Sequence, residues 1–118
     1  MTQNLENLSY EERIAQVRKR FIHTLEEKLG DIADAIQMAP ETCSDETQAH
    51  KLHRMLHDMG GNAAMLEFDE IEKIIRYGVD IAEKADIEGS ELTQDQKTRL
   101  AAIVDDAIAA GALLREQY

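Results

Sequence analysis

Three of the four histidines lie close together in the middle of the chain, at His50, His53 and His57. Spacings of three and four residues place side chains on one face of a helix. Imidazole carries a lone pair near neutral pH, and it can bind metals, exchange protons or act as a nucleophile. This histidine row is therefore the first candidate for chemistry in the sequence.

Small residues follow the last histidine of the row. Gly60 and Gly61 lie one turn beyond His57, and Ala64 lies two turns beyond it. A glycine inside a helix costs roughly 1 kcal/mol relative to alanine. A marginally stable domain retains that cost most readily where bulk must be excluded. The pattern predicts that another molecule closely approaches His57.

The histidine row admits four interpretations. One is an exposed polar helix surface without chemistry. Another is a metal site, but His50 and His57 are about 10.5 Å apart along a helix axis, and no second His/Cys pair exists to complete the ligands. A third is acid–base catalysis by His57 with Asp58, although adjacent residues do not face each other on a helix. The fourth makes His57 a nucleophile that is presented to a partner.

The balance of charges argues against several partners. The chain has 13 Lys and Arg against 24 Asp and Glu, a formal charge of −11. Such a surface is repelled by nucleic acid and by anionic lipid, so neither is expected as a partner. No apolar run approaches the roughly 18 residues of a membrane-spanning helix, and the polar start Met1–Glu6 is unlike a signal peptide. We therefore expect a cytoplasmic protein.

The length of 118 residues and the 43% apolar content indicate one domain, 1–118, in which residues 1–8 form a flexible tail. Its first helix is expected to begin at a capping box, Ser9–Glu12. Gly30 is expected to divide this helix and Pro40 to end it, before a loop at 40–44 that holds the lone Cys43 as a free thiol. The expected buried positions are Ile14, Val17, Phe21, Leu25, Leu29, Ile32 and Ile36.

Three further helical segments follow this loop. The second runs from about residue 45 to 66, and the third begins at a cap made by Asp69 and Glu72. A polar loop, 86–90, leads to a last helix that opens with the capping box Thr93–Gln96. The expected buried positions are Leu52, Met55, Leu56, Met59, Ala63, Leu66, Ile71, Ile74, Ile75, Gly78, Ile81, Ala82, Ala85, Leu100, Ile103, Val104, Ala107, Ile108 and Leu114. The pattern predicts an all-α fold, an antiparallel four-helix bundle with an additional N-terminal helix or helix extension.

The ten residues from His57 to Leu66, HDMGGNAAML, resemble the signature of histidine phosphotransfer (HPt) domains, His-x-Leu-Lys-Gly-Ser-Ala-x-x-Leu-Gly. The residues on matching positions are His57, Gly61, Ala63 and Leu66, with Met59 in place of leucine and Asn62 in place of a small polar residue. The resemblance covers most of the chain, because the family is also a helical bundle of about this length with its histidine midway along the second long helix.

The resemblance implies that His57 accepts a phosphoryl group and passes it to or from the aspartate of response-regulator receiver domains. The implied partners are these receivers and a histidine kinase, including hybrid kinases. The sequence has no nucleotide-binding loop and no acidic cluster arranged for Mg²⁺, so no cofactor is expected in this chain and the Mg²⁺ is expected at the receiver. The domain would then be a phosphocarrier without turnover of its own. The residues expected to support His57 or meet its partner are Lys51, His53, Arg54, Gly60, Gly61, Asn62 and Ala64.

Two positions depart from the family signature. The lysine three residues after the histidine, which holds the phosphoryl group in the family, is here Gly60, and the glycine after the last leucine is Glu67. Arg54, one turn before His57, and Lys51, nearly two turns before it, can supply the missing positive charge. The alternative function is a helical interaction module that docks a receiver or kinase without being phosphorylated.

Overall fold

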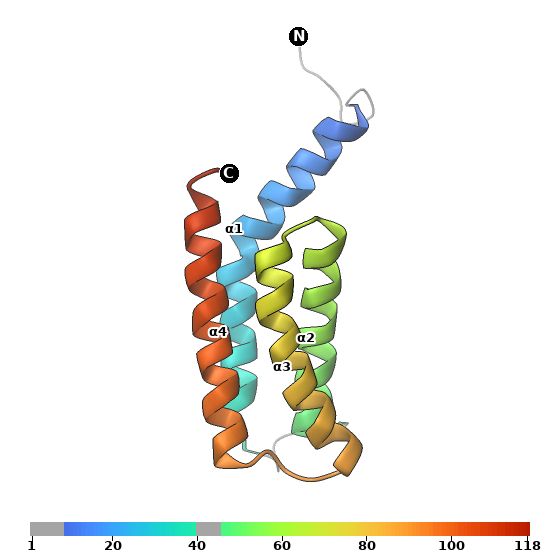
Figure 1. The fold of residues 1–118 in the computed structure, drawn as a ribbon, viewed down its shortest axis with the longest axis vertical. Helices are drawn as coiled ribbons and strands as arrows, with labels where there is room; N and C mark the ends of the chain where they lie inside the picture. Colours follow the sequence, from blue (N-terminus) through green and yellow to red (C-terminus); the bar gives the residue numbers. More distant parts are fainter. Residues whose placement is uncertain (1–8, 40–45) are drawn as a thin grey trace.

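The computed structural model describes residues 9–39 and 46–118. Within these ranges the chain forms four α-helices and no strand: α1 (Tyr10–Gln37), α2 (Gln48–Met65), α3 (Asp69–Glu88) and α4 (Gln94–Arg115). Successive helices run in opposite directions and pack side by side, and α4 returns to pack against α1 (Figure 1). The predicted all-α, antiparallel four-helix bundle is confirmed.

Side-chain caps explain where three of the helices begin. The hydroxyl oxygens of Ser9, Thr47 and Thr93 each accept a hydrogen bond from the backbone N–H three residues later. At α4 the Gln96 side chain also accepts from the backbone N–H of Thr93, which completes the predicted capping box. The second helix begins at Gln48, three residues later than the predicted start near residue 45, because Thr47 is its N-cap.

The start of α3 contradicts the prediction of a polar cap. Asp69 is the first residue of the helix, and its N-cap, Phe68, forms no side-chain capping bond. The turn from α2 is short, with Glu67 in the left-handed conformation at φ 63° and the Phe68 side chain only 3% exposed. This tight turn and the buried ring fix the start of α3. Glu72 instead pairs with an arginine one turn later.

The helix α1 is continuous, so the prediction that Gly30 divides it is wrong. Gly30 is half-buried, and the side chains of Leu29 and Ile32 beside it are buried in the core. This packing outweighs the roughly 1 kcal/mol that glycine costs in a helix. The helix ends at Gln37, before Pro40. Pro40, Cys43, the loop 40–44 and the tail 1–8 lie outside the described residues.

The N-terminal part of α1 extends beyond the ends of its neighbours (Figure 1). Ile14 is therefore only half-buried, and Val17 is 43% exposed, contrary to the expected burial of both. From Phe21 onward the predicted apolar positions of α1 are buried. The additional N-terminal element is thus a helix extension and not a separate helix.

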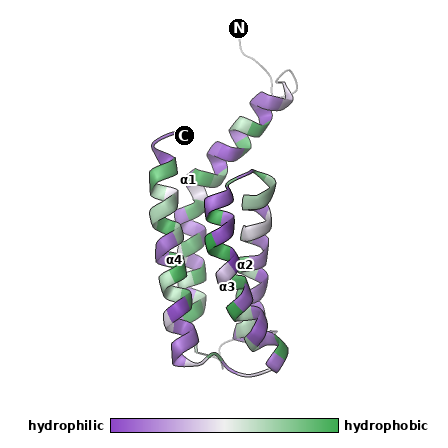
Figure 2. Cartoon of the chain, viewed as in Figure 1, coloured by the Kyte–Doolittle hydropathy of each residue, from purple (hydrophilic) through white to green (hydrophobic). Residues whose placement is uncertain are grey.

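The core is formed by buried residues from all four helices. Hydrophobic and hydrophilic residues alternate along each helix (Figure 2). Besides Ile14, six predicted core positions are only partly buried: Met55, Ile74, Ile81, Ile103, Ile108 and Leu114. The largest fully buried side chains are Ile22, Leu25, Leu29, Ile32, Ile36, Leu52, Leu56, Ile71, Ile75 and Leu100. None of the described helices is long and apolar enough to cross a membrane.

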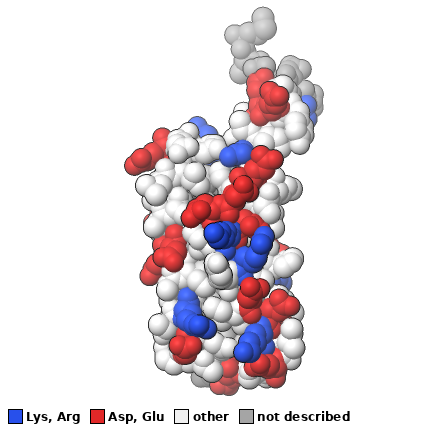
Figure 3. Space-filling model, viewed as in Figure 1, with Lys and Arg blue, Asp and Glu red and all other residues white. Residues whose placement is uncertain are grey.

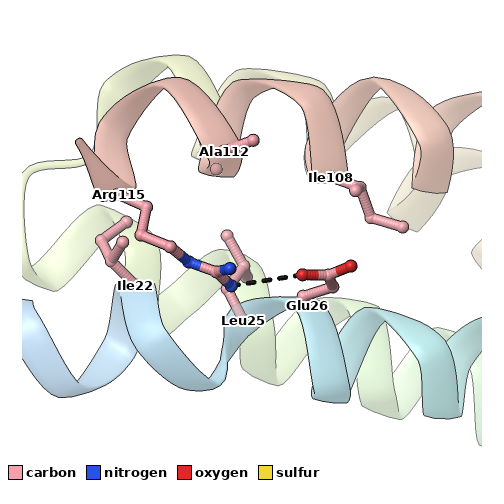
Figure 4. A pocket seen from close by; sticks show the side chains of 7 residues that line it. Ile22, Leu25, Glu26, Ile108, Ala112 and Arg115 are labelled. Carbon is pink, nitrogen blue, oxygen red and sulfur yellow. Dashed lines mark hydrogen bonds and ion pairs between the residues drawn. The ribbon is translucent and has the colours of Figure 1, made fainter.

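A glycine allows α4 to lie close to α1. A Cβ atom at the buried Gly111 would stand 2.8 Å from Cδ2 of Leu25, closer than carbon atoms pack. At the edge of the same seam, the Arg115 guanidinium reaches across to the Glu26 carboxylate, with 3.3 Å between Nη2 and Oε2 (Figure 4). This close packing joins α4 to α1, while the three histidines of the row lie on α2.

Candidate functional site

The buried face of α2 decides which way its histidines point. Leu52, Leu56 and Met59 are buried in the core, as the sequence predicts. The His57 side chain, on another face of the helix, is 72% exposed. The position midway along a rigid helix therefore presents this imidazole to solvent.

The two earlier histidines are in contact with α3. Oδ2 of Asp86 lies 3.0 Å from Nδ1 of His50 and 3.3 Å from Nδ1 of His53. These hydrogen bonds, that of His50 first, hold the pKa of the Asp86 carboxyl below its usual range, against the opposing effect of desolvation. His50 and His53 therefore bind the two helices together.

Asp86 itself was expected in a loop, and that prediction is wrong. It lies in the last turn of α3, which continues to Glu88. Gly89 ends the helix in the left-handed conformation at φ 65°, as glycine does after many helices. This glycine was the usable signal in the sequence for the true end of α3.

His57 has no comparable partner among the described residues. Its Nδ1 is 4.0 Å from Oδ1 of Asp58, too long for a hydrogen bond, and both side chains are well exposed. The ring of His53 meets that of His57 edge-on, with 6.2 Å between the ring centroids. The imidazole of His57 is therefore unrestrained by hydrogen bonds and accessible from outside.

One open pocket brings His57 together with residues of α3. Its volume is about 240 Å³, which is ample for a phosphoryl-sized group. The residues that line it are His57, Gly60, Gly61 and Ala64 from α2, and Glu72, Arg76 and Val79 from α3. The three small residues are thus where the sequence places them. Arg76 and Glu72 were missed, because the apolar pattern does not give the register of α3 against α2.

Neither glycine beside His57 is required by packing or by backbone conformation. A Cβ at Gly61 would meet nothing within 4 Å, and one at Gly60 would make an ordinary 3.4 Å contact with Cγ2 of Ile75. Among the described glycines, only Gly89 has a positive φ. The helix therefore has room for a Cβ atom at both positions. The absence of side chains beside His57 fits the predicted close approach of another molecule.

Arg54 and Asn62 line a different groove, between α1 and α2. The Arg54 guanidinium is bound to Glu46, with 2.6 Å between Nη2 and Oε1, and this hydrogen bond lowers the pKa of the Glu46 carboxyl. Lys51 is half-buried and lines neither this groove nor the His57 pocket. The structure does not bring the predicted cations of α2 into the pocket of His57.

Basic side chains are interspersed with acidic ones on the face that Figure 3 shows. Lys and Arg lie near its middle and toward both ends, with acidic side chains among them. In the described ranges, no three His, Cys, Asp or Glu side chains are grouped so that they could hold a metal ion. The fourth histidine, His23, is on α1 and contacts the backbone oxygen of Tyr118.

Comparison with known families identifies the chain. The model of the Hpt domain family matches residues 16–110, which include all four helices in part or in full. The chain therefore belongs to the Hpt domain family, whose members are phosphocarriers of two-component signalling. No curated protein and no solved structure matches the chain.

Proposed function

We propose that this chain is a phosphorelay intermediate that accepts a phosphoryl group on His57 and passes it to or from the aspartate of a response-regulator receiver domain. The observation that carries the proposal is the contrast within α2. His57 is exposed, forms no hydrogen bond within residues 9–39 and 46–118, and lines an open pocket, whereas His50 and His53 are bound to Asp86. Membership of the Hpt family supports the choice of His57, because His57 occupies the histidine position of the family signature.

This chemistry requires of His57 a free imidazole nitrogen that a partner can approach. With the proton on Nδ1, we assign the attack to Nε2, the nitrogen at the outer end of the ring. Its lone pair forms the N–P bond while the P–O bond to the receiver aspartate breaks, and the aspartate leaves as a carboxylate. The ring proton stays on Nδ1 until solvent removes it. The reverse reaction returns the group to an aspartate.

The partners supply what this chain does not. Transfer through a loose transition state depends on positioning and on cations beside the phosphoryl oxygens. We assign the Mg²⁺ to the receiver and the nucleotide to a histidine kinase, which includes hybrid kinases. The chain then has no cofactor and no turnover of its own. The small side chains at Gly60, Gly61 and Ala64 let the receiver approach the imidazole.

A second function remains open because Gly60 replaces the lysine of the family signature. In that case the domain docks a receiver or a kinase and carries no phosphate. The two functions differ in a single observable, the retention of phosphate by His57.

The test is label transfer from a panel of phosphorylated receiver domains to the full chain, followed by mass mapping of the acid-labile phosphate. We expect label on the peptide that contains His57. Label on His53 would overturn the assignment of the residue. A chain that binds receivers and remains unlabelled would instead establish the docking function.

A further inference from the structure

A phosphoryl group on His57 needs a neighbouring cation. The group carries close to two negative charges near neutral pH, and the chain around it has a formal charge of −11. The turn of α2 that follows His57, Asp58–Gly61, contains no Lys or Arg. The charge must be balanced from another helix or by the partner alone.

Among the residues that the structure describes, Arg76 is the one basic residue that lines the His57 pocket. It projects from α3, which forms the opposite wall, and its side chain is 67% exposed, so it is free to change its orientation. A guanidinium binds phosphoryl oxygens through two parallel N–H donors. We propose that Arg76 binds the phosphoryl group carried by His57, and that Glu72 holds this arginine in the unphosphorylated domain. The inference rests on the function proposed above.

In the unphosphorylated domain, Glu72 forms an ion pair with Arg76 inside the pocket. Its carboxylate pairs with Nη2 of Arg76, one turn later on α3, and lines the same pocket. The side chain of Glu72 is only 21% exposed, so it stays in place while the more exposed Arg76 turns. Phosphoryl oxygens on His57 then compete with this carboxylate for the guanidinium. Glu72 positions Arg76 and at the same time weakens its hold on phosphate.

The glycine at position 60 is consistent with a cation that comes from α3. Gly60 faces α3, where its Cβ would touch Ile75, the residue before Arg76. A long side chain at this position would enter the space between the two helices. Glycine leaves that space to the arginine from the opposite wall.

The competing cation on α2 is committed elsewhere. Arg54 makes two hydrogen bonds to Glu46, through Nη2 and Nε, and lines the groove between α1 and α2. To reach the phosphoryl group it would have to leave this ion pair and cross to the other side of His57. Arg76 already lines the pocket.

The experiment uses the full chain and a small donor, potassium phosphoramidate, so that no partner contributes cations. Attack by Nε2 of His57 breaks the P–N bond of the donor and releases ammonia. The rate constant of phosphorylation and the half-life of the phosphohistidine are measured by mass spectrometry. We expect Arg76→Gln to lower one or both by about two- to fivefold, the range for an exposed ion pair. Arg76→Lys keeps the charge and should recover part of the loss.

The matched control is Arg99→Gln on α4. Arg99 is as exposed as Arg76 and also pairs with an acidic residue four positions earlier, Asp95, but it does not line the pocket. It should leave both quantities unchanged. Circular dichroism and thermal unfolding of each variant confirm an intact fold, which is expected because both arginines are exposed.

Glu72→Gln tests the resting pair. It should raise the phosphorylation rate about two- to fivefold, and the gain should vanish in the double variant Glu72→Gln/Arg76→Gln. An equal gain in the double variant would show that only the negative charge of Glu72 matters, and would refute the holding role.

The outcomes separate this inference from the function on which it rests. If the wild-type chain takes phosphate on His57 and Arg76→Gln matches it in both rate and half-life, the role of Arg76 is refuted and the proposed function stands. A loss that appears in Arg54→Gln instead would transfer the role to Arg54. If neither phosphoramidate nor any phosphorylated receiver labels His57 in the wild-type chain, both proposals fail.

Discussion

The two halves of α2 carry the same residue type in opposite settings. In the first half, His50 and His53 share one carboxylate of α3 and hold two helices together. In the second half, His57 has no hydrogen bond among the described residues and opens onto a pocket. The helical spacing puts all three on one side of α2, so the difference comes from the neighbouring helix. Asp86 reaches the first two histidines and leaves the third free.

The glycines of the bundle also have contrasting settings, some buried between helices and one in open space beside His57. Gly78 is buried, and a Cβ there would touch Leu56 and Ile103, while Gly111 allows the close approach of Leu25. Both glycines are buried between helices, and at Gly111 a Cβ would have no room. Gly61 has no neighbour within 4 Å of its Cβ position, so packing does not explain it. A glycine with space around it, next to a free imidazole, is the clearest mark of a surface kept open for a partner.

The largest expected effect is the loss of phosphate labelling when His57, in the second half of α2, is replaced. His57→Gln should abolish labelling by phosphorylated receivers, because the attacking nitrogen is lost. The control, His50→Gln, removes a hydrogen bond to Asp86 and should keep the label. Labelling is followed with radioactive phosphate at matched protein concentrations. Full labelling of the His57→Gln protein would show that the open half of α2 is not the acceptor site.

The next effect concerns the space at Gly61. Gly61→Gln should slow transfer from a receiver at least tenfold, on the order of 1.4 kcal/mol, because its side chain stands between the imidazole and the partner. Stability should rise by up to about 1 kcal/mol, since glutamine is the better helix former. Gly30→Gln on α1 is the matched control, with nothing within 4 Å of its Cβ position. It should be similarly stabilised and transfer normally, and equal transfer in both variants would contradict the open approach.

The packed glycines predict the opposite result. Gly78→Leu should lower the free energy of unfolding by about 1–3 kcal/mol, because its side chain must enter the contact between Leu56 and Ile103. Chemical denaturation measures this change. Transfer per folded molecule should remain within about twofold of wild type. A Gly78→Leu protein as stable as wild type would mean that the helices can shift apart, and the division of the glycines would fail.

The sequence predicts the bundle well because its signals are local. Apolar spacing, the cap at Ser9 and the capping box at Thr93 depend on residues within a few turns, and the structure confirms them. The errors occur where tertiary packing outweighs local preference. Gly30 stays helical because its neighbours are buried, and a buried phenylalanine starts α3 in place of a polar cap.

In the site, too, the residues that local signals identify differ from those that only tertiary packing reveals. His57 and its small neighbours are identified within one helix, by spacing and by the family signature. Asp86, Glu72 and Arg76 belong to α3, and only the three-dimensional packing shows which turn of α3 meets which turn of α2. A single sequence contains no local signal for that register. Arg54 looked suitable from its place on α2, but its ion pair with Glu46 was not visible in the spacing.

The smallest expected effect concerns Asp86 and changes with pH. Hydrogen bonds from His50 and His53 lower the pKa of this carboxyl in the folded state. A lowered folded pKa means that the ionised form stabilises the fold above the unfolded value of about 3.9, and that this contribution is lost as the pH falls through the folded pKa. Asp86→Asn should therefore reduce the free energy of unfolding at pH 6 by about 1 kcal/mol or less, since the groups are partly exposed.

The difference between Asp86→Asn and wild type should shrink below pH 4 and approach zero once the wild-type carboxyl is protonated as well. Urea denaturation at pH 6, 4 and 2.5 measures it. A difference that persists unchanged at pH 2.5 would show that Asp86 acts through packing and not through its charge. Phosphorylation of His57 should continue in this variant, because His57 does not contact Asp86 by any hydrogen bond in the described structure. If the rate of His57 phosphorylation fell together with stability, the half of α2 that contains His50 and His53 would also position His57. The two halves would then form one site.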